Sequence, residues 1–275
     1  MTINCKGKLI DLNTPKVMGI LNITPDSFFD GGKYMCKSAL LHQAEKMLQE
    51  GAHFMDVGSY SSRPGADHIS EEEEIKRLIP AIELLMKHFP DSLISVDTFR
   101  SVVAKKAIEA GASLINDISG GEMDSLMFQM VADLQVPYIL MHMKGTPQNM
   151  QQNPFYEDII LEVNQYFAEK VSQLRNLGVH DIILDAGFGF GKTLKHNYQL
   201  LKNHELIGFG ELPILTGISR KSMIYTTLNT TPQKSLNGTT VLNTIALQKG
   251  ASILRVHDVK EAMECIQLIE TLQSS

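Results

Sequence analysis

The sequence has few cysteines and no excess of positive charge, and each shortage excludes a class of protein. Its three cysteines, Cys5, Cys36 and Cys265, lie far apart with no CxxC pair, so neither a disulfide framework nor a zinc site is predicted. The 31 acidic residues outnumber the 25 basic ones, which gives a formal net charge of -6. Without a general basic field we expect no nucleic-acid partner and no anionic membrane partner, and any anion site must be local.

Long hydrophobic runs are also missing. No apolar stretch approaches the length of a membrane span, and the first residues lack the basic segment, apolar stretch and small-residue cleavage site of a signal peptide. The sparse cysteines agree with a reducing compartment. We therefore expect a cytoplasmic protein, and 275 residues with 43% hydrophobic content suffice for one large core.

Short apolar runs alternate with longer amphipathic stretches along the whole chain, which predicts βα units and a parallel sheet. No Ser- or Pro-rich linker divides them, so we predict the α/β class, as one closed (β/α)8 TIM barrel over residues 1–275 rather than an open doubly wound sheet. The first fifteen residues are expected to form a small hairpin across the N-terminal mouth. The eight predicted strands are "VMGIL" before Asn22, "HFMDVGS" from His53, "LISVD" from Leu93, "LINDIS" from Leu114, "PYILMHM" from Pro137, "IILDAG" from Ile182, "PILTGIS" from Pro213 and "ILRVH" from Ile253.

The second helix carries a clear start signal. Ser70 can cap it, Glu73 is placed as the capping-box partner, and an apolar stripe follows. We interpret the run "EEEE" from Glu71 as a solvated face, with ion pairs Glu72–Lys76 and Glu73–Arg77, rather than as a metal site.

Polar side chains stand at the carboxyl ends of all eight runs. In a barrel these ends converge on one cavity, so distant residues can surround one small ligand. Each residue alone could simply cap a helix or satisfy loop backbone, but eight together favour a site. They are Asn22, Ser61 to Arg63, Asp97, Asn116, His142, Asp185, Ser219 to Lys221, and Arg255 with His257.

The residue types suggest two tasks. Asp97, Asn116 and Asp185 can pair with the N–H donors of a planar heterocycle. Cationic donors of the kind that hold a polyphosphate come from Arg63, Lys221, Arg255 and His257, beside the predicted start of the last helix. We therefore expect a heterocycle joined to a phosphate leaving group.

Two motifs mimic other sites. "AGFGFGKT" from Ala186 resembles a P-loop but lacks its first Gly and any second nucleotide signature, and its spacing does not fit a dinucleotide site. We expect its glycines to let backbone and Phe190 approach a flat ring. His142 is interpreted as a structural histidine, since no second ligand stands at metal spacing, and Met141 could touch the ring.

Over essentially the full chain, these residues resemble the dihydropteroate synthase family. The motifs are "GILNITPDSFFDGG" from Gly19, "DVGSYSSRPGA" from Asp56, "SVDT" from Ser95, "INDISG" from Ile115, "LMHMKGTP" from Leu140, "LDAGFGFGK" from Leu184, "GISRKSMI" from Gly217 and "RVHDVKE" from Arg255. The resemblance implies condensation of 6-hydroxymethyl-7,8-dihydropterin diphosphate with 4-aminobenzoate, giving dihydropteroate and pyrophosphate for folate synthesis. It also implies a Mg²⁺ ion, a homodimer through the last helices, and a site for sulfonamides, which resemble aminobenzoate.

The resemblance also implies a role for each site residue. Asn22 would be the magnesium-side residue, and the loop "NITPDSFFDGG" would close over the diphosphate. Asp97, Lys221 and Arg255 would be catalytic. The pterin would be held by Asp97, Asn116, Asp185 and Lys221, with Met141 and Gly217; the diphosphate by Arg63, Arg255 and His257; and the aminobenzoate by Ser62, Pro64, Phe28, Phe190 and Ser219.

The chain departs from the common family pattern "DVGGESTRPGA" at Ser59, Tyr60 and Ser62, and Ala186 stands where a Pro is usual. None of these changes removes a group that the chemistry requires. Two other functions stay open: a pterin-binding methyltransferase domain, and a homologue that binds pterin without turnover. Retention of Arg63, Lys221 and Arg255 argues against both.

Overall fold

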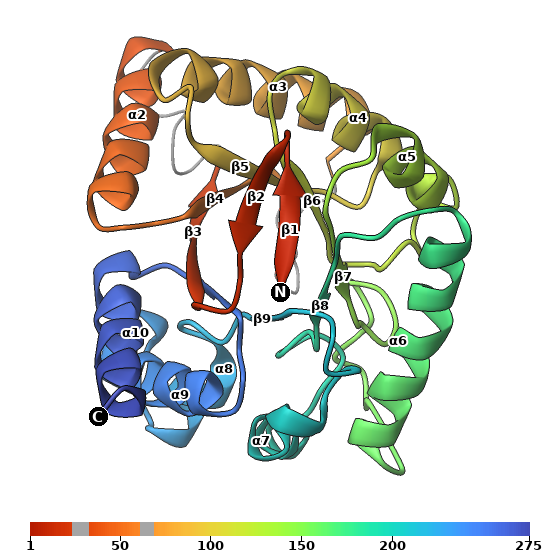
Figure 1. Cartoon of the computed structure of the whole chain (residues 1–275), viewed down its shortest axis with the longest axis vertical. Coiled ribbons are helices and arrows are strands. Elements are labelled where there is room, and N and C mark those ends of the chain that lie inside the picture. The colour runs from red at the N-terminus through yellow and green to blue at the C-terminus, as the bar shows by residue number, and fades with distance from the viewer. Residues whose placement is uncertain (24–32, 61–68) are drawn as a thin grey trace.

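The computed structural model describes residues 1–23, 33–60 and 69–275, apart from the side chains of residues 33–36. Eight parallel strands close into a barrel in the order β10-β3-β4-β5-β6-β7-β8-β9. All eight predicted strands are present and the predicted TIM barrel is confirmed (Figure 1). They are β3 (Lys16–Asn22), β4 (Phe54–Gly58), β5 (Leu93–Asp97), β6 (Leu114–Asp117), β7 (Tyr138–Met141), β8 (Ile182–Asp185), β9 (Ile214–Thr216) and β10 (Ile253–Val256).

Helices surround the strands as an outer ring (Figure 1). Their apolar faces share one core with the outward side chains of the barrel; in α3, Leu78 and Ile82 belong to the same cluster as Val57 of β4. None of the helices in the described part of the chain combines the length and apolar character needed to cross a membrane. The helices are α2 (Lys33–Gln49), α3 (Glu71–His88), α4 (Ser101–Glu109), α5 (Met127–Leu134), α6 (Ile159–Asn176), α7 (Leu194–Lys202), α8 (Ser222–Thr227), α9 (Leu236–Gln248) and α10 (Val259–Gln273), with 3-10 turns η1 (His204–Leu206) and η2 (Pro232–Lys234).

The N-terminal hairpin fills the floor of the barrel. Strands β1 (Thr2–Cys5) and β2 (Lys8–Asp11) pair antiparallel and lie across the barrel in Figure 1. Their buried Ile3, Cys5 and Ile10 share a cluster with the lowest inward side chains of the barrel. These are Met18, Phe54, Leu114, Ile139, Ile183, Leu215 and Ile253, joined by Leu93. The predicted hairpin is confirmed, and it excludes water from this end.

Alternation along the strands places polar groups above this apolar floor. Residues two apart on a strand face the same side, so the next inward positions can be counted from the floor. They are Ile20, Asp56, Ser95, Asn116, Met141, Asp185, Gly217 and Arg255, of which five are polar or charged. The inward face therefore changes from apolar to polar and charged toward the carboxyl ends of the strands.

The start of α3 corrects one expectation. Ser70 caps the helix by accepting from the backbone N–H of Glu73 at 3.2 Å, but the Glu73 carboxylate pairs with Arg77 at 2.7 Å and, more loosely, with Lys76 at 3.9 Å. The interpretation of the whole "EEEE" run as a solvated face was wrong, because Glu74 is fully buried. It lies four residues before Leu78, on the helix face that packs inward.

Candidate active site

An ion-pair network of one guanidinium and two carboxylates occupies the mouth of the barrel. Nε of Arg255 on β10 donates to Oδ2 of Asp56 on β4 at 2.6 Å, and its Nη2 donates to Oδ2 of Asp97 on β5 at 2.8 Å. Strand β3 separates β10 from β4 in the sheet, so the guanidinium reaches these carboxylates across the barrel interior. Gly58 leaves room for Asp97, because a Cβ at position 58 would come within 3.0 Å of the Asp97 Cβ.

Asn116 extends this group from the next strand. Its Nδ2 donates to the same Asp56 oxygen at 2.9 Å, which leaves the amide oxygen as an acceptor for a ligand. The other Asp56 oxygen, Oδ1, is buried and has no hydrogen-bond partner among the described residues. Asp56 was not predicted as a site residue, although a charged residue inside the apolar run "HFMDVGS" was a usable signal.

Asp185 and Lys221 lie on another part of the mouth. Asp185 ends β8 and accepts from the backbone N–H of Gly187 at 2.8 Å. Lys221 precedes α8, donates to the Phe188 carbonyl at 2.5 Å, and holds its Nζ 4.9 Å from the centroid of the Phe190 ring. Gly217 lies between the two cations, since a Cβ there would be 3.8 Å from both Lys221 Nζ and the Arg255 Cβ.

Burial shifts the pKa values of three of these groups toward neutral pH. It raises the pKa of Asp97 to about 7, with the charge of Asp56 adding to the rise and Arg255 opposing it. Burial also raises the pKa of Asp185, which the positive charge of Lys221 opposes. Burial lowers the pKa of Lys221 to about 8, against the attraction of Asp185. Such displaced pKa values gathered at one mouth are typical of an active site.

Ser219 and His257 form a separate pair at the ends of β9 and β10. Ser219 Oγ lies 3.1 Å from His257 Nδ1 and accepts from the His257 backbone N–H at 3.2 Å. The adjacent ion pair Arg220–Asp258, at 2.6 Å, ties the same two loops together. These contacts fix the two loops relative to each other.

An apolar wall borders the mouth. Met141, only 2% exposed, packs in a cluster with Phe99, Ile118, Met143 and Met150, and Phe190 packs against it. A flat ring bound beside Asp185 would lie near this wall. The wall thus offers the apolar contact that a heterocycle needs beside its polar partners.

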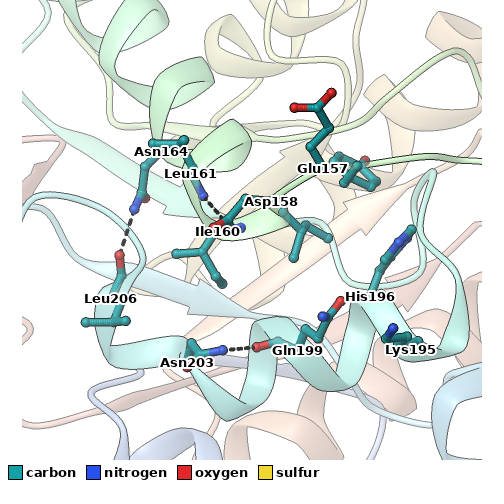
Figure 2. A pocket seen from close by; sticks show the side chains of 12 residues that line it. Glu157, Asp158, Ile160, Leu161, Asn164, Lys195, His196, Gln199, Asn203 and Leu206 are labelled. Carbon is teal, nitrogen blue, oxygen red and sulfur yellow. Dashed lines mark hydrogen bonds between the residues drawn. The ribbon is translucent and has the colours of Figure 1, made fainter.

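A separate hollow lies on the flank of the barrel, between the start of α6 and α7. It measures about 580 Å³, and Figure 2 shows its lining. Its polar groups already bind within the protein: Asn164 donates to the Leu206 carbonyl, and Asn203 to the Gln199 carbonyl. Among the residues that line this hollow, no carboxylate and no cation is buried, unlike at the mouth.

Comparisons with known proteins identify the family of the chain. A family model described as pterin binding enzyme matches residues 18–257. The dihydropteroate synthase of Escherichia coli (strain K12) is 43% identical over 278 residues, which cover 100% of this chain and 98% of that protein. That of Haemophilus influenzae is 41% identical over 271 residues, with 98% of each chain covered. The chain belongs to the dihydropteroate synthase family.

Solved structures of the family share the whole architecture. The Yersinia pestis dihydropteroate synthase in complex with a sulfonamide drug is 42% identical, with a TM-score of 0.93 and 100% of both chains covered. The Xanthomonas albilineans dihydropteroate synthase in complex with 7,8-dihydropteroate is 34% identical, with a TM-score of 0.88 and 100% of both chains covered. The resemblance inferred from the motifs is thereby confirmed, and dihydropteroate synthases are transferases.

The structure brings most of the predicted site residues to one end of the barrel. Asp97 and Asn116 join Arg255 through direct or shared contacts, and Asp185 neighbours Lys221. Their individual roles stay predictions. Phe28, Ser62, Arg63 and Pro64 lie outside the described residues.

Few of the described side chains are placed to bind the expected Mg²⁺ ion. No group of three His, Cys, Asp or Glu side chains suited to a metal occurs in the described ranges. Asn22, exposed at the end of β3, offers one amide oxygen, and it lies in register with Gly58, which lies in register with Asp97. One protein oxygen fits magnesium when substrate phosphates and water supply the other ligands.

Two departures from the dihydropteroate synthase pattern have a structural context. Tyr60 packs edge-on against Phe99, with ring centroids 5.0 Å apart, and its hydroxyl accepts from Gln148 at 3.2 Å. It therefore packs against the apolar wall, and its ring also lies 5.7 Å from the Arg100 guanidinium carbon. Ala186 is buried in the barrel core, 1% exposed, where a small side chain suffices.

Proposed function

We propose that this chain condenses 6-hydroxymethyl-7,8-dihydropterin diphosphate with 4-aminobenzoate, giving 7,8-dihydropteroate and pyrophosphate in folate synthesis. Likeness to dihydropteroate synthases over the full chain supports the reaction. The observation that carries it is the Arg255 guanidinium held between Asp56 and Asp97, with Lys221 and Asp185 at the same mouth. Neither a pterin-binding methyltransferase nor a silent homologue needs these cations for a diphosphate.

Hydrogen-bond acceptors of the protein recognise the pterin ring. Asp185 keeps one oxygen on the Gly187 N–H and offers the other to the adjacent ring N–H donors. Asn116 offers its amide oxygen, because Asp56 orients the amide by accepting from Nδ2. Met141 and Phe190 support the flat face of the ring. A ligand lacking these donors would leave buried acceptors unpaired.

The chemical step breaks the carbon–oxygen bond at the pterin methylene. Positive charge develops on the methylene and is stabilised by the Asp97 carboxylate, while Arg255, Lys221, His257 and Arg63 stabilise the departing pyrophosphate. Asn22 would be the protein residue on the side of a bound Mg²⁺ ion, which would supply further positive charge at the leaving group.

The second substrate needs little activation. The amine of 4-aminobenzoate attacks the methylene and then loses a proton, so no covalent enzyme intermediate is required. Ser219, positioned by His257, contributes to its pocket with Phe190, Phe28, Ser62 and Pro64.

Pyrophosphate release tests the reaction directly. The purified chain is mixed with both substrates and Mg²⁺, and pyrophosphate and dihydropteroate should form in equal amounts. Pterin binding without pyrophosphate would identify a silent homologue. Methyl transfer to or from a folate without use of aminobenzoate would identify the methyltransferase alternative.

We also propose a cytoplasmic homodimer that associates through α9 and α10. Exposed apolar side chains on these helices support the surface: Val241 is 50% exposed, Leu268 71% and Leu272 66%. Light scattering coupled to gel filtration should give twice the 30.6 kDa chain mass. A monomer at micromolar concentration would contradict this assembly.

A further inference from the structure

Lys192, which ends the motif "AGFGFGK", is a buried cation that the reaction does not use. Only 3% of it is exposed. Its Nζ contacts His142 Nδ1 at 2.9 Å, the His142 carbonyl at 3.2 Å and the Phe190 carbonyl at 2.9 Å. An ammonium has three donors and no acceptor, so these three acceptors satisfy it completely.

This contact fixes the state of His142. When Lys192 is charged, its ammonium can only donate, so Nδ1 of His142 accepts and the neutral ring carries its hydrogen on Nε2. Burial and the charge of Lys192 both lower the pKa of His142 well below its ordinary value. The ring also packs edge-on against Tyr166, with centroids 4.9 Å apart. His142 is thus the structural histidine that the sequence indicated, and Lys192 is its partner.

Lys192 joins the loop Gly187–Gly191 to the segment that follows β7. Gly187 and Gly191 have left-handed φ values of 65° and 60°. A Cβ on Gly187 would collide with the His142 carbonyl oxygen, and one on Gly191 with the Lys144 carbonyl oxygen. The loop therefore lies directly on this segment, and the glycines serve that close contact.

Side chains hold four successive carbonyls of the loop. Phe188 accepts from Lys221 at 2.5 Å and Gly189 from Gln151 at 2.6 Å. Phe190 accepts from Lys192, and Gly191 from Tyr156 at 2.9 Å. A neutral side chain at position 192 would release the Phe190 carbonyl, the one next to the ring of the apolar wall.

The same loop presents groups that recognise the pterin. Gly187 donates to Asp185, and Phe190 packs against the wall. Burial lowers the pKa of Lys192 to about 7; the negative charge of Asp185 opposes this shift and the positive charge of Lys221 adds to it. In its charged form, Lys192 places a buried positive charge near the carboxylate of Asp185.

We propose that Lys192 is a positioning residue for pterin recognition: its ammonium joins His142 to the Phe190 carbonyl and holds the loop Gly187–Gly191 in its binding conformation. The inference rests on the proposed function, because it assumes that Asp185 and Phe190 contact the pterin. We expect Lys192 to affect pterin binding rather than the chemical step, since its ammonium contacts only His142 and the Phe190 carbonyl.

The test compares Lys192→Met with Lys195→Met by calorimetry of 6-hydroxymethylpterin binding. Methionine keeps a long unbranched side chain but donates no hydrogen bond. Lys195 is exposed beside the flank hollow and serves as the control (Figure 2). Pterin affinity should fall about tenfold in Lys192→Met, as expected for lost charge-assisted bonds, and stay unchanged in the control. In turnover, the pterin KM should rise more than kcat falls.

Nitrogen NMR of His142 supplies a readout that general destabilisation would not produce. In the parent protein Nδ1 should appear as an unprotonated acceptor; in Lys192→Met the pKa of His142 should rise toward its ordinary value, because the neighbouring positive charge is gone. If Lys192→Met does not fold, Lys192→Leu provides a shorter side chain that also donates no hydrogen bond, with the same expected results.

Three results would overturn the inference. They are a folded Lys192→Met with pterin affinity within twofold of the parent, an unchanged His142 signal, and an equal loss in Lys195→Met. The binding assay does not depend on turnover, so a parent protein that binds pterin but releases no pyrophosphate contradicts the proposed reaction alone.

Discussion

Asp56 connects the two sides of the mouth through one oxygen atom. That oxygen accepts from both Arg255 and Asn116, so the carboxylate aligns the residue proposed to bind the diphosphate with one proposed to bind the pterin ring. Its charge also contributes to the raised pKa of Asp97. Asp56 therefore affects both the positions of the Arg255 and Asn116 side chains and the protonation of Asp97.

Replacing Asp56 by Asn separates these two effects. The amide oxygen can still accept from Arg255 and Asn116, but the negative charge is lost. Because Asp56 raises the pKa of Asp97, removing its charge should lower that pKa from about 7. In the proposed mechanism Asp97 acts in its ionised form, so activity rises with pH through its pKa, and the acid limb of kcat/KM should move to lower pH.

A pH–rate profile of each variant checks this shift. Ser95→Ala is the control, because Ser95 is the register partner of Asp56 and carries no charge. An acid limb that stays in place, or moves to higher pH, would show that Asp56 does not set the protonation of Asp97.

Asp185→Asn should weaken pterin binding strongly. The amide oxygen would stay on the Gly187 N–H, which turns the amide N–H group toward the ring donors. Two opposed donors in a buried site should cost about 2–3 kcal/mol, or roughly 30- to 150-fold in Kd by calorimetry. The control is Asp181→Asn at the opposite end of the same strand, where Asp181 accepts from Asn4. Equal affinity for both variants would remove Asp185 from the ring-reading group.

At the scale of elements, the first turn of α3 is tied to the end of β5 by a buried acid. Glu74 accepts from Thr98 Oγ1 at 2.7 Å and forms an ion pair with Arg100, which also donates to the Ile69 carbonyl at 2.7 Å. Burial raises the pKa of Glu74, and these contacts oppose the rise. The pair therefore connects α3 to the segment that follows β5 and to Ile69, two residues before α3.

Glu74→Gln should destabilise the fold. The amide can keep the Thr98 hydrogen bond but leaves the guanidinium of Arg100, 11% exposed, without its charged partner. The expected loss is about 2–4 kcal/mol of unfolding free energy, measured by urea denaturation.

The adjacent Glu73 is the matched control for this loss. Glu73 is partly exposed and pairs with Arg77, so Glu73→Gln should change stability by less than about 1 kcal/mol. Similar losses for both variants would mean that the buried pair stabilises α3 no more than a surface pair does.

For the whole molecule, the sequence predicted the barrel but not every contact inside it. The alternation of apolar runs with amphipathic stretches was enough to predict the eight strands and the hairpin. The spacing of apolar residues in each stretch reflects whether one face or both faces of the element are buried. Polar residues at strand ends also predicted Asp97, Asn116 and Asp185 at one mouth. Asp56 and the Lys192–His142 contact were missed, because they depend on which inward side chains meet across the barrel, and spacing along the chain does not contain that information.

We expect the apolar floor of the barrel to contribute to stability and the opposite end to contribute to binding. Substitutions in the hairpin test this division. Ile3 is 1% exposed in the floor, whereas Leu9 on the same hairpin is 70% exposed. Ile3→Ala should lower the free energy of unfolding by about 2–4 kcal/mol through a cavity in the floor, and Leu9→Ala by less than about 0.5 kcal/mol. Pterin affinity, measured by calorimetry well below the melting temperature, should stay within about twofold for both, because active sites of this fold lie at the opposite end. A folded Ile3→Ala that binds pterin much more weakly would show that the floor is coupled to the mouth, through the single layer of inward side chains between them.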